Sequence, residues 1–65
     1  MSDMYRLKYK DKWMKVIRMT GTYIYKLFDD PNEVEPTSLN KAQAGRTLVC
    51  ADNNLEIEDI EIVKV

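Results

Sequence analysis

The sequence predicts a small α+β domain of order β-β-β-α-β: a three-stranded antiparallel meander, one helix and a C-terminal strand. Apolar and charged residues alternate in three short runs over residues 4–28, and a period of two places successive side chains on opposite faces of a sheet. Apolar residues then follow at helical spacing from residue 39. β-branched residues are frequent in residues 60–65, which is typical of a strand.

The three predicted strands are residues 4–10, 13–19 and 22–28, separated by turns at Asp11-Lys12 and Thr20-Gly21. Aspartate tolerates a positive φ, and glycine adopts one without steric cost. Residues 29–36 contain two prolines and several acidic residues, a composition that predicts a connecting loop without regular structure.

Thr37 or Ser38 offers an N-cap hydroxyl for the helix. One interpretation continues the helix to about Ala51 and ends it at residues 52–54. The other ends it at Gly45, because glycine disfavours a helix interior, and makes residues 47–51 a strand paired with residues 55–57. We expect the longer helix, because a free apolar sheet face needs a lid longer than two turns.

Two-residue turns would give the meander two different faces. One face is apolar and aromatic with a single charge, and we expect the helix to cover it: Tyr5, Leu7, Tyr9, Met14, Val16, Arg18, Tyr23, Tyr25 and Leu27. In the alternative, the helix covers the other face and the lysine side chains extend to its edges.

The second face combines basic and aromatic residues, in the predicted rows Arg6–Ile17–Ile24, Lys8–Lys15–Lys26 and Lys10–Trp13–Phe28. Three lysines side by side repel one another. The same face would expose a contiguous apolar area that monomers seldom leave bare. This register depends on both turn lengths, since one extra residue in either turn would scatter the lysine row. The predicted partner-binding residues are Arg6, Lys8, Lys10, Trp13, Lys15, Lys26 and Phe28.

Length and charge limit the organisation of the chain. Sixty-five residues predict one domain over 1–65, near the lower size limit for independent folding. Residues 1–28 carry seven basic and two acidic side chains, whereas residues 29–65 carry three basic and nine acidic ones. This asymmetry favours a charged partner or head-to-tail association, although the two halves could also simply attract each other. The absence of a long apolar run and of a signal segment, together with a single cysteine, predicts a cytoplasmic protein that does not enter a membrane.

The residues that most enzymes need are scarce. There is no histidine, the usual general base and the commonest metal ligand. Cys50 lies in an apolar stretch and is expected to be a buried, inert thiol. The acidic residues between 52 and 61 lack the spacing and glycine of an EF-hand, and the isolated Gly21 and Gly45 form no phosphate-binding loop. We therefore expect no catalysis, no cofactor and no metal site.

Three stretches resemble the short accessory proteins of bacteriophages and prophages, particularly those of Gram-positive hosts. These stretches are residues 21–31 (GTYIYKLFDDP), 38–43 (SLNKAQ) and 54–65 (NLEIEDIEIVKV), and the similarity is one of size, element order and style. The resemblance implies a protein of the host-cell cytoplasm that binds and blocks a host enzyme or defence complex, as anti-CRISPR proteins do. It transfers no functional residues to this chain.

The leading hypothesis is a non-enzymatic protein-binding module that uses the basic and aromatic face. The second is a nucleic-acid-binding module in which lysines contact phosphate and Trp13 stacks on a base. Salt separates the two, because phosphate contacts weaken steeply as salt rises, and the acidic pI of about 5.3 disfavours nucleic acid. The third hypothesis is a structural homodimer that covers Trp13 and Phe28.

Overall fold

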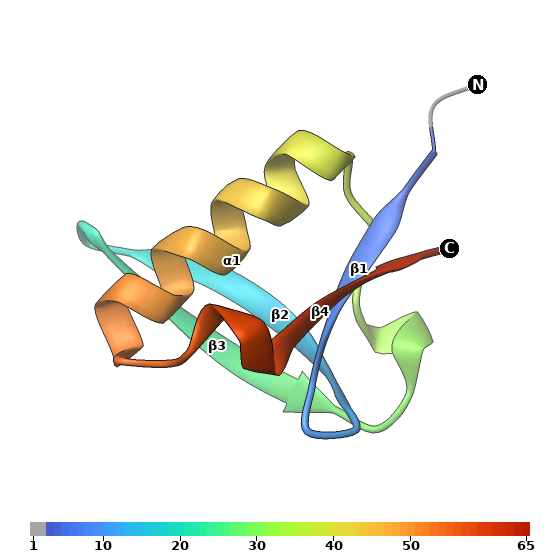
Figure 1. Cartoon of the computed structure of the whole chain (residues 1–65), viewed down its shortest axis with the longest axis horizontal. Coiled ribbons are helices and arrows are strands. Elements are labelled where there is room, and N and C mark those ends of the chain that lie inside the picture. Colours follow the sequence, from blue (N-terminus) through green and yellow to red (C-terminus); the bar gives the residue numbers. More distant parts are fainter. Residues whose placement is uncertain (1–2) are drawn as a thin grey trace.

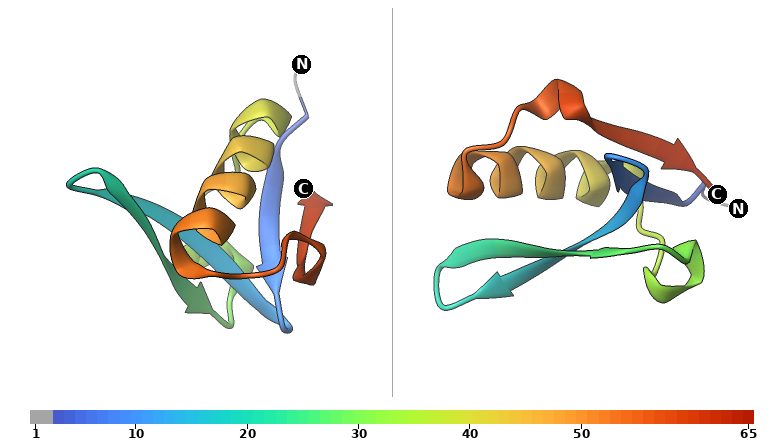
Figure 2. Two further views of the ribbon diagram at one scale, coloured as in Figure 1. Left: turned by 60° about the vertical axis from the view of Figure 1, so that its left-hand side comes forward. Right: turned by 90° about the horizontal axis from the view of Figure 1, so that it is seen from below.

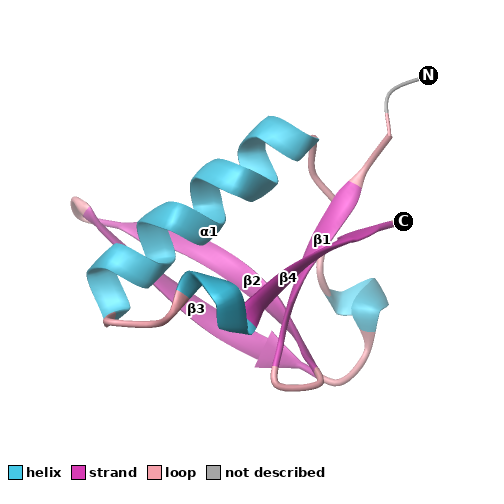
Figure 3. Ribbon diagram, viewed as in Figure 1, coloured by secondary structure: helices cyan, strands magenta, loops and turns pink. Residues whose placement is uncertain are grey.

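The computed structural model describes residues 3–65 and has an α+β fold (Figure 1). Its strands pair in one antiparallel sheet of order β3-β2-β1-β4. The predicted class is therefore confirmed, and the C-terminal strand joins the meander beside β1. The elements, distinguished by type in Figure 3, are β1 (Tyr5–Tyr9), β2 (Lys12–Met19), β3 (Thr22–Phe28), the 3₁₀ turn η1 (Pro31–Glu33), α1 (Leu39–Asn53), the 3₁₀ turn η2 (Ile57–Asp59) and β4 (Ile60–Lys64).

Both turns of the meander are two residues long, but only the second lies where the sequence predicted it. Thr20 and Gly21 have φ values of 38° and 81°. The first turn consists of Lys10 and Asp11, with φ values of 49° and 64°, so the prediction of Asp11-Lys12 is wrong. Positive φ at both central residues is the requirement of a type I′ hairpin turn. Lys12 consequently begins β2 opposite Tyr9.

The position of the first turn changes the register between β1 and β2 by two residues. Lys8 lies opposite Trp13, not opposite Lys15 as predicted. Because the shift is an even number, every side chain keeps its face, but the predicted rows of three are wrong. The β2–β3 register is as predicted, with Trp13 opposite Phe28 and Lys15 opposite Lys26. Of the three lysines predicted to lie in one row, only Lys15 and Lys26 lie opposite each other.

The longer of the two predicted helices is confirmed, and the hairpin of residues 47–51 with 55–57 is wrong. Ser38 is the N-cap, and its hydroxyl accepts a hydrogen bond from the backbone N–H of Lys41 at 3.4 Å. Asn54, with φ 57°, is the C-cap and donates its N–H to the carbonyl of Cys50. A left-handed asparagine is a common helix ending. Within residues 3–65, no helix combines the length and apolar character needed to cross a membrane.

Helix α1 lies on the apolar face of the sheet, as the sequence predicted (Figure 2). The core joins Leu7, Tyr9 and Met14 of the sheet to Ala42, Val49 and Cys50 of α1 and Ile60 of β4. Met14 and Val49 are 1% and 0% exposed. Gly45 faces β2, and a Cβ at this position would make an ordinary contact of 3.7 Å with Cγ2 of Val16. The small residues on this helix face allow the close packing.

The connection from β3 to α1 was expected to be irregular, and it contains the single 3₁₀ turn η1. The Asp30 carboxylate accepts from the N–H of Asn32 at 3.0 Å, and Pro31 opens the turn. Further along, Thr37 and Tyr5 exchange two backbone hydrogen bonds of 2.7 and 2.8 Å. Since the backbone of Tyr5 bonds Thr37, the register of β1 with β2 covers only Leu7–Tyr9 and Lys12–Met14. Strands β1 and β2 therefore separate beyond this short pairing.

Candidate functional site

Six of the seven predicted partner-binding residues share the sheet face that α1 does not cover. We call this group the basic sheet face: Arg6, Lys8, Trp13, Lys15, Lys26 and Phe28. Lys15 and Lys26 are exposed, and the other four are half-buried. Lys10 was predicted opposite Trp13 but lies in the β1–β2 turn, where its ammonium is 5.2 Å from the ring centroid of Tyr9. It therefore leaves the predicted surface.

Lys15 and Lys26 are the central pair of the basic sheet face. They lie directly opposite each other on β2 and β3. Among residues 3–65 the ion pairs are Lys12–Asp29 and Lys64–Asp3, so neither lysine of the central pair has a carboxylate partner. Like charges opposite each other destabilise a sheet. We therefore expect an acidic residue at either position to raise the stability of the free protein.

Trp13 has a neighbour on each adjacent strand of the sheet. Phe28 lies opposite it on β3, and the ammonium of Lys8 lies 5.3 Å from its ring centroid. This is a cation–π distance. The predicted bare apolar area is smaller than expected, because Trp13, Ile17, Ile24 and Phe28 are all half-buried. A face-to-face homodimer through these side chains therefore has less apolar surface to cover.

Glu61 and Val63 lie on the same side of the sheet as the basic sheet face. The sequence did not predict this, because it did not show which strand β4 pairs with. Glu61 lies opposite Lys8, and Val63 lies opposite Arg6. The alternation in residues 60–64 shows that Glu61 and Val63 share a face, but only the sheet order assigns that face. Glu61 reduces the positive charge on the β1 side of the sheet. Lys15 and Lys26, by contrast, lie opposite each other and not opposite an acidic residue.

Arg6 connects the basic sheet face to the β3–α1 connection. Its Nε donates to the carbonyl of Val34 at 2.7 Å, and Val34 is 5% exposed. Val34 is buried apart from the main core. Arg6 therefore fixes a loop that the sequence left unplaced, and part of its hydrogen-bonding capacity is already used.

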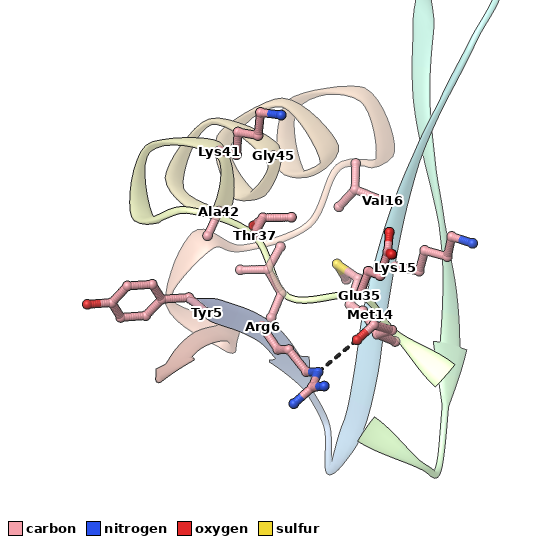
Figure 4. Close-up of a pocket in the computed structure, with 12 residues that line it drawn as sticks. Tyr5, Arg6, Met14, Lys15, Val16, Glu35, Thr37, Lys41, Ala42 and Gly45 are labelled. Carbon is pink, nitrogen blue, oxygen red and sulfur yellow. Dashed lines mark hydrogen bonds between the residues drawn. The ribbon is translucent and has the colours of Figure 1, made fainter. Parts of the chain in front are cut away.

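A hollow of about 320 Å³ lies between β1, β2 and the first turns of α1 (Figure 4). It forms because β1 and β2 diverge and because Ala42 and Gly45 are small. Val16 points toward the helix, whereas Lys15 points away on the other side of β2. The remaining lining residues are Tyr5, Arg6, Leu7, Met14, Val34, Glu35, Thr37 and Lys41. Its lining thus combines apolar side chains with charged ones.

Cys50 is 6% exposed, and burial raises the pKa of its thiol. A raised pKa lowers the thiolate fraction at neutral pH, so the thiol is poorly reactive. Within residues 3–65, no three histidine, cysteine, aspartate or glutamate side chains are grouped as metal ligands would be.

Comparison of the chain with protein-family models, with curated proteins and with solved structures gave no match.

Proposed function

We propose that this chain is a non-enzymatic binding module whose basic sheet face docks on an acidic surface of a partner protein. The observation that carries the proposal is the exposed pair Lys15–Lys26, which has no carboxylate partner among residues 3–65. A pair of like charges lowers the stability of the free protein, and an acidic surface on a partner would neutralise both charges on binding. The half-buried Trp13 and Phe28 beside the pair supply apolar contacts of the kind found at protein interfaces.

Two features favour a protein over a nucleic acid as the partner. Lys8 already covers the ring of Trp13, which hinders stacking of a base on that ring. The hollow beside Lys15 has an apolar floor and accepts a side chain better than a phosphate. Nucleic-acid-binding domains also tend to be basic overall, whereas this chain has a net charge of −1.

The proposal includes the role implied by the resemblance to phage accessory proteins. In that role the chain acts in the cytoplasm of a host cell and blocks a host enzyme or defence complex, which anti-CRISPR proteins exemplify. A small module of this kind needs no catalytic group, and the lack of histidine and the buried Cys50 are consistent with that role.

A pair of charge reversals on β2 tests the proposal. Lys15→Glu reverses charge on the basic sheet face, whereas Arg18→Glu makes the same change three residues away on the opposite face. We expect a host protein that is retained by the parent and by Arg18→Glu. Retention by Lys15→Glu should be about tenfold weaker, since a buried charge contact is lost. Quantitative mass spectrometry after affinity capture measures this ratio.

Equal retention of every captured protein by Lys15→Glu and the parent would contradict the proposal. A labelled single-stranded oligonucleotide provides the second arm of the test. If the parent binds it, and the logarithm of affinity falls with the logarithm of salt with a slope that Lys15→Glu reduces by about one, the partner is nucleic acid.

A further inference from the structure

Each outer strand of the sheet has its outward backbone groups hydrogen-bonded at one end only. We call this the closed end of the edge. Strands β3 and β4 are the outer strands. At the start of β3, two side chains from the end of α1 form hydrogen bonds with the outward backbone groups of Tyr23. The carboxylate of Asp52 accepts the Tyr23 N–H at 2.8 Å, and the Asn53 amide donates to the Tyr23 carbonyl at 2.8 Å. These two side chains take the place of a neighbouring strand.

The start of β4 is closed in a similar way. The N–H of Ile60 donates to the carbonyl of Ile57 in η2. The carbonyl of Ile60 accepts from Nη1 of Arg46 at 3.3 Å. Both edges of the sheet thus have their first outward-facing residue satisfied by α1 or by η2.

Beyond these closed ends the edges are open. In an antiparallel sheet, alternate residues direct their backbone groups to the same side. The backbone N–H and C=O groups of Tyr25 and Leu27 are therefore directed away from β2, like those of Tyr23. The backbone groups of Ile62 and Lys64 are likewise directed away from β1, like those of Ile60. Within residues 3–65, no backbone or side-chain group bonds the outward N–H or C=O of these four residues. Each edge presents two free N–H and two free C=O groups.

We propose that these edges pair head to tail, so that β3 of one copy lies antiparallel to β4 of the next copy and the sheet continues from copy to copy. In the matching register, Tyr25 lies opposite Lys64 of the next copy and Leu27 lies opposite Ile62 of the next copy. Two residues facing each other in this way exchange two hydrogen bonds. This register satisfies every free group on both edges and keeps both helices on the same side of the sheet.

The closed ends fix this register. In it, β4 of the next copy extends along β3 from Asp29 to Ile24 and does not reach Tyr23. Sliding β4 two residues further would place Lys64 opposite Tyr23 and Ile60 opposite Leu27. Tyr23 and Ile60 have no free backbone groups to offer. The incoming strand therefore cannot pair in this shifted register, because the hydrogen bonds of Asp52, Asn53 and Arg46 already use these backbone groups.

Charge favours unlike edges over like edges. Two β3 edges matched through their free groups would place Lys26 opposite Lys26, which repels. Two β4 edges could pair, but both β3 edges would stay open. In the head-to-tail register Lys26 lies opposite Val63, with Glu61 on the diagonal, where long side chains can reach each other. Lys26 thereby gains a carboxylate neighbour that it lacks in the single copy.

A head-to-tail interface that does not close into a ring gives open chains of copies. The parent protein should therefore exceed 7.6 kDa, with its average mass still rising from about 10 µM to about 1 mM, the range in which weak association is populated. Sedimentation equilibrium measures this mass. The association should weaken at high salt because Lys26 and Glu61 contribute to it.

Two proline substitutions separate the edges. Leu27→Pro removes an outward N–H from β3, and Lys64→Pro removes one from β4. Proline is tolerated on an edge strand where the N–H faces solvent, so both variants should fold. Lys26→Pro is the matched control, because the N–H of Lys26 bonds β2 and its loss should disrupt the sheet. Each single variant should sediment as one copy. Their equimolar mixture should form a two-copy complex that grows no further, because only one compatible pair of edges remains.

A parent protein that stays monomeric at about 1 mM would overturn the proposal, since even weak interfaces are populated there. Self-association of Leu27→Pro alone would show that β4 pairs with β4, and self-association of Lys64→Pro alone would show that β3 pairs with β3. If circular dichroism shows that a proline variant is unfolded, Lys26→Glu replaces it, because this change keeps every backbone group. Its dissociation constant should rise about fivefold over that of the parent, and an unchanged constant contradicts the proposal. Leu27→Pro and Lys64→Pro leave Lys15 and Lys26 unchanged, so the proline test is independent of the partner-binding test. Lys26→Glu changes the basic sheet face as well, and it is therefore read by self-association alone.

Discussion

The two faces of the sheet are built from the same three strands but follow different physical rules. On the face under α1, Leu7, Met14 and Ile60 are at most 6% exposed, and no charged residue among 3–65 is buried. On the basic sheet face, Lys15 and Lys26 lie opposite each other, and neither forms an ion pair within the described part of the chain. The covered face is arranged for stability. The uncovered face contains an arrangement that stability alone disfavours, and such a departure is typical of a surface kept for binding.

Adjacent residues of β2 give the largest contrast between the faces. Met14→Asp places a carboxylate where the side chain is 1% exposed, at a cost of at least about 3 kcal/mol. A domain of this size has only about 3–5 kcal/mol to lose, so the variant should be largely unfolded by circular dichroism. Lys15→Asp, one residue along, should fold as well as the parent. If Met14→Asp melts within a few degrees of the parent, the assignment of faces is wrong.

The sequence revealed this contrast because a period of two is a local property. Each residue's face depends on the alternation within its own strand, so an error of two residues in the β1–β2 register left every face unchanged. The helix extent was predictable for a similar reason. The Ser38 cap and the asparagines after residue 52 lie in the sequence next to the turns that they begin and end.

Contacts between distant segments could not be predicted in this way. Asp52 and Tyr23 are 29 residues apart, and neither carries a local signal of the other. The choice between Lys10-Asp11 and Asp11-Lys12 as the first turn depends on which pair of residues adopts positive φ, and the lysine could have been in either pair. The position of β4 beside β1, which brings Glu61 to the basic sheet face, depends on the packing of the whole chain.

The hollow between β1, β2 and α1 offers a smaller test. Gly45→Ala should raise the free energy of unfolding by about 0.5–1 kcal/mol, because alanine favours a helix interior over glycine. The new Cβ would meet Cγ2 of Val16 at 3.7 Å, an ordinary contact. The same methyl group narrows the hollow. If a partner inserts a side chain there, Gly45→Ala binds it more weakly although it is more stable, as urea unfolding and partner capture together would reveal. A less stable Gly45→Ala protein would show that α1 and β2 cannot accommodate the added methyl group.

The smallest effect concerns the lysine pair itself. Lys15→Glu and Lys26→Glu each replace a repulsive contact by an attractive one, and each should raise the free energy of unfolding by a few tenths of a kcal/mol. The gain is limited to one neighbouring pair, because Lys8 lies opposite Trp13 and not opposite Lys15. The double variant restores two like charges, so its stability should return close to that of the parent. This non-additivity separates the pair from any general benefit of added acidic residues, since independent sites add. Two gains that simply sum in the double variant would show that Lys15 and Lys26 do not repel each other. The basic sheet face would then differ from the covered face only in its exposure to solvent.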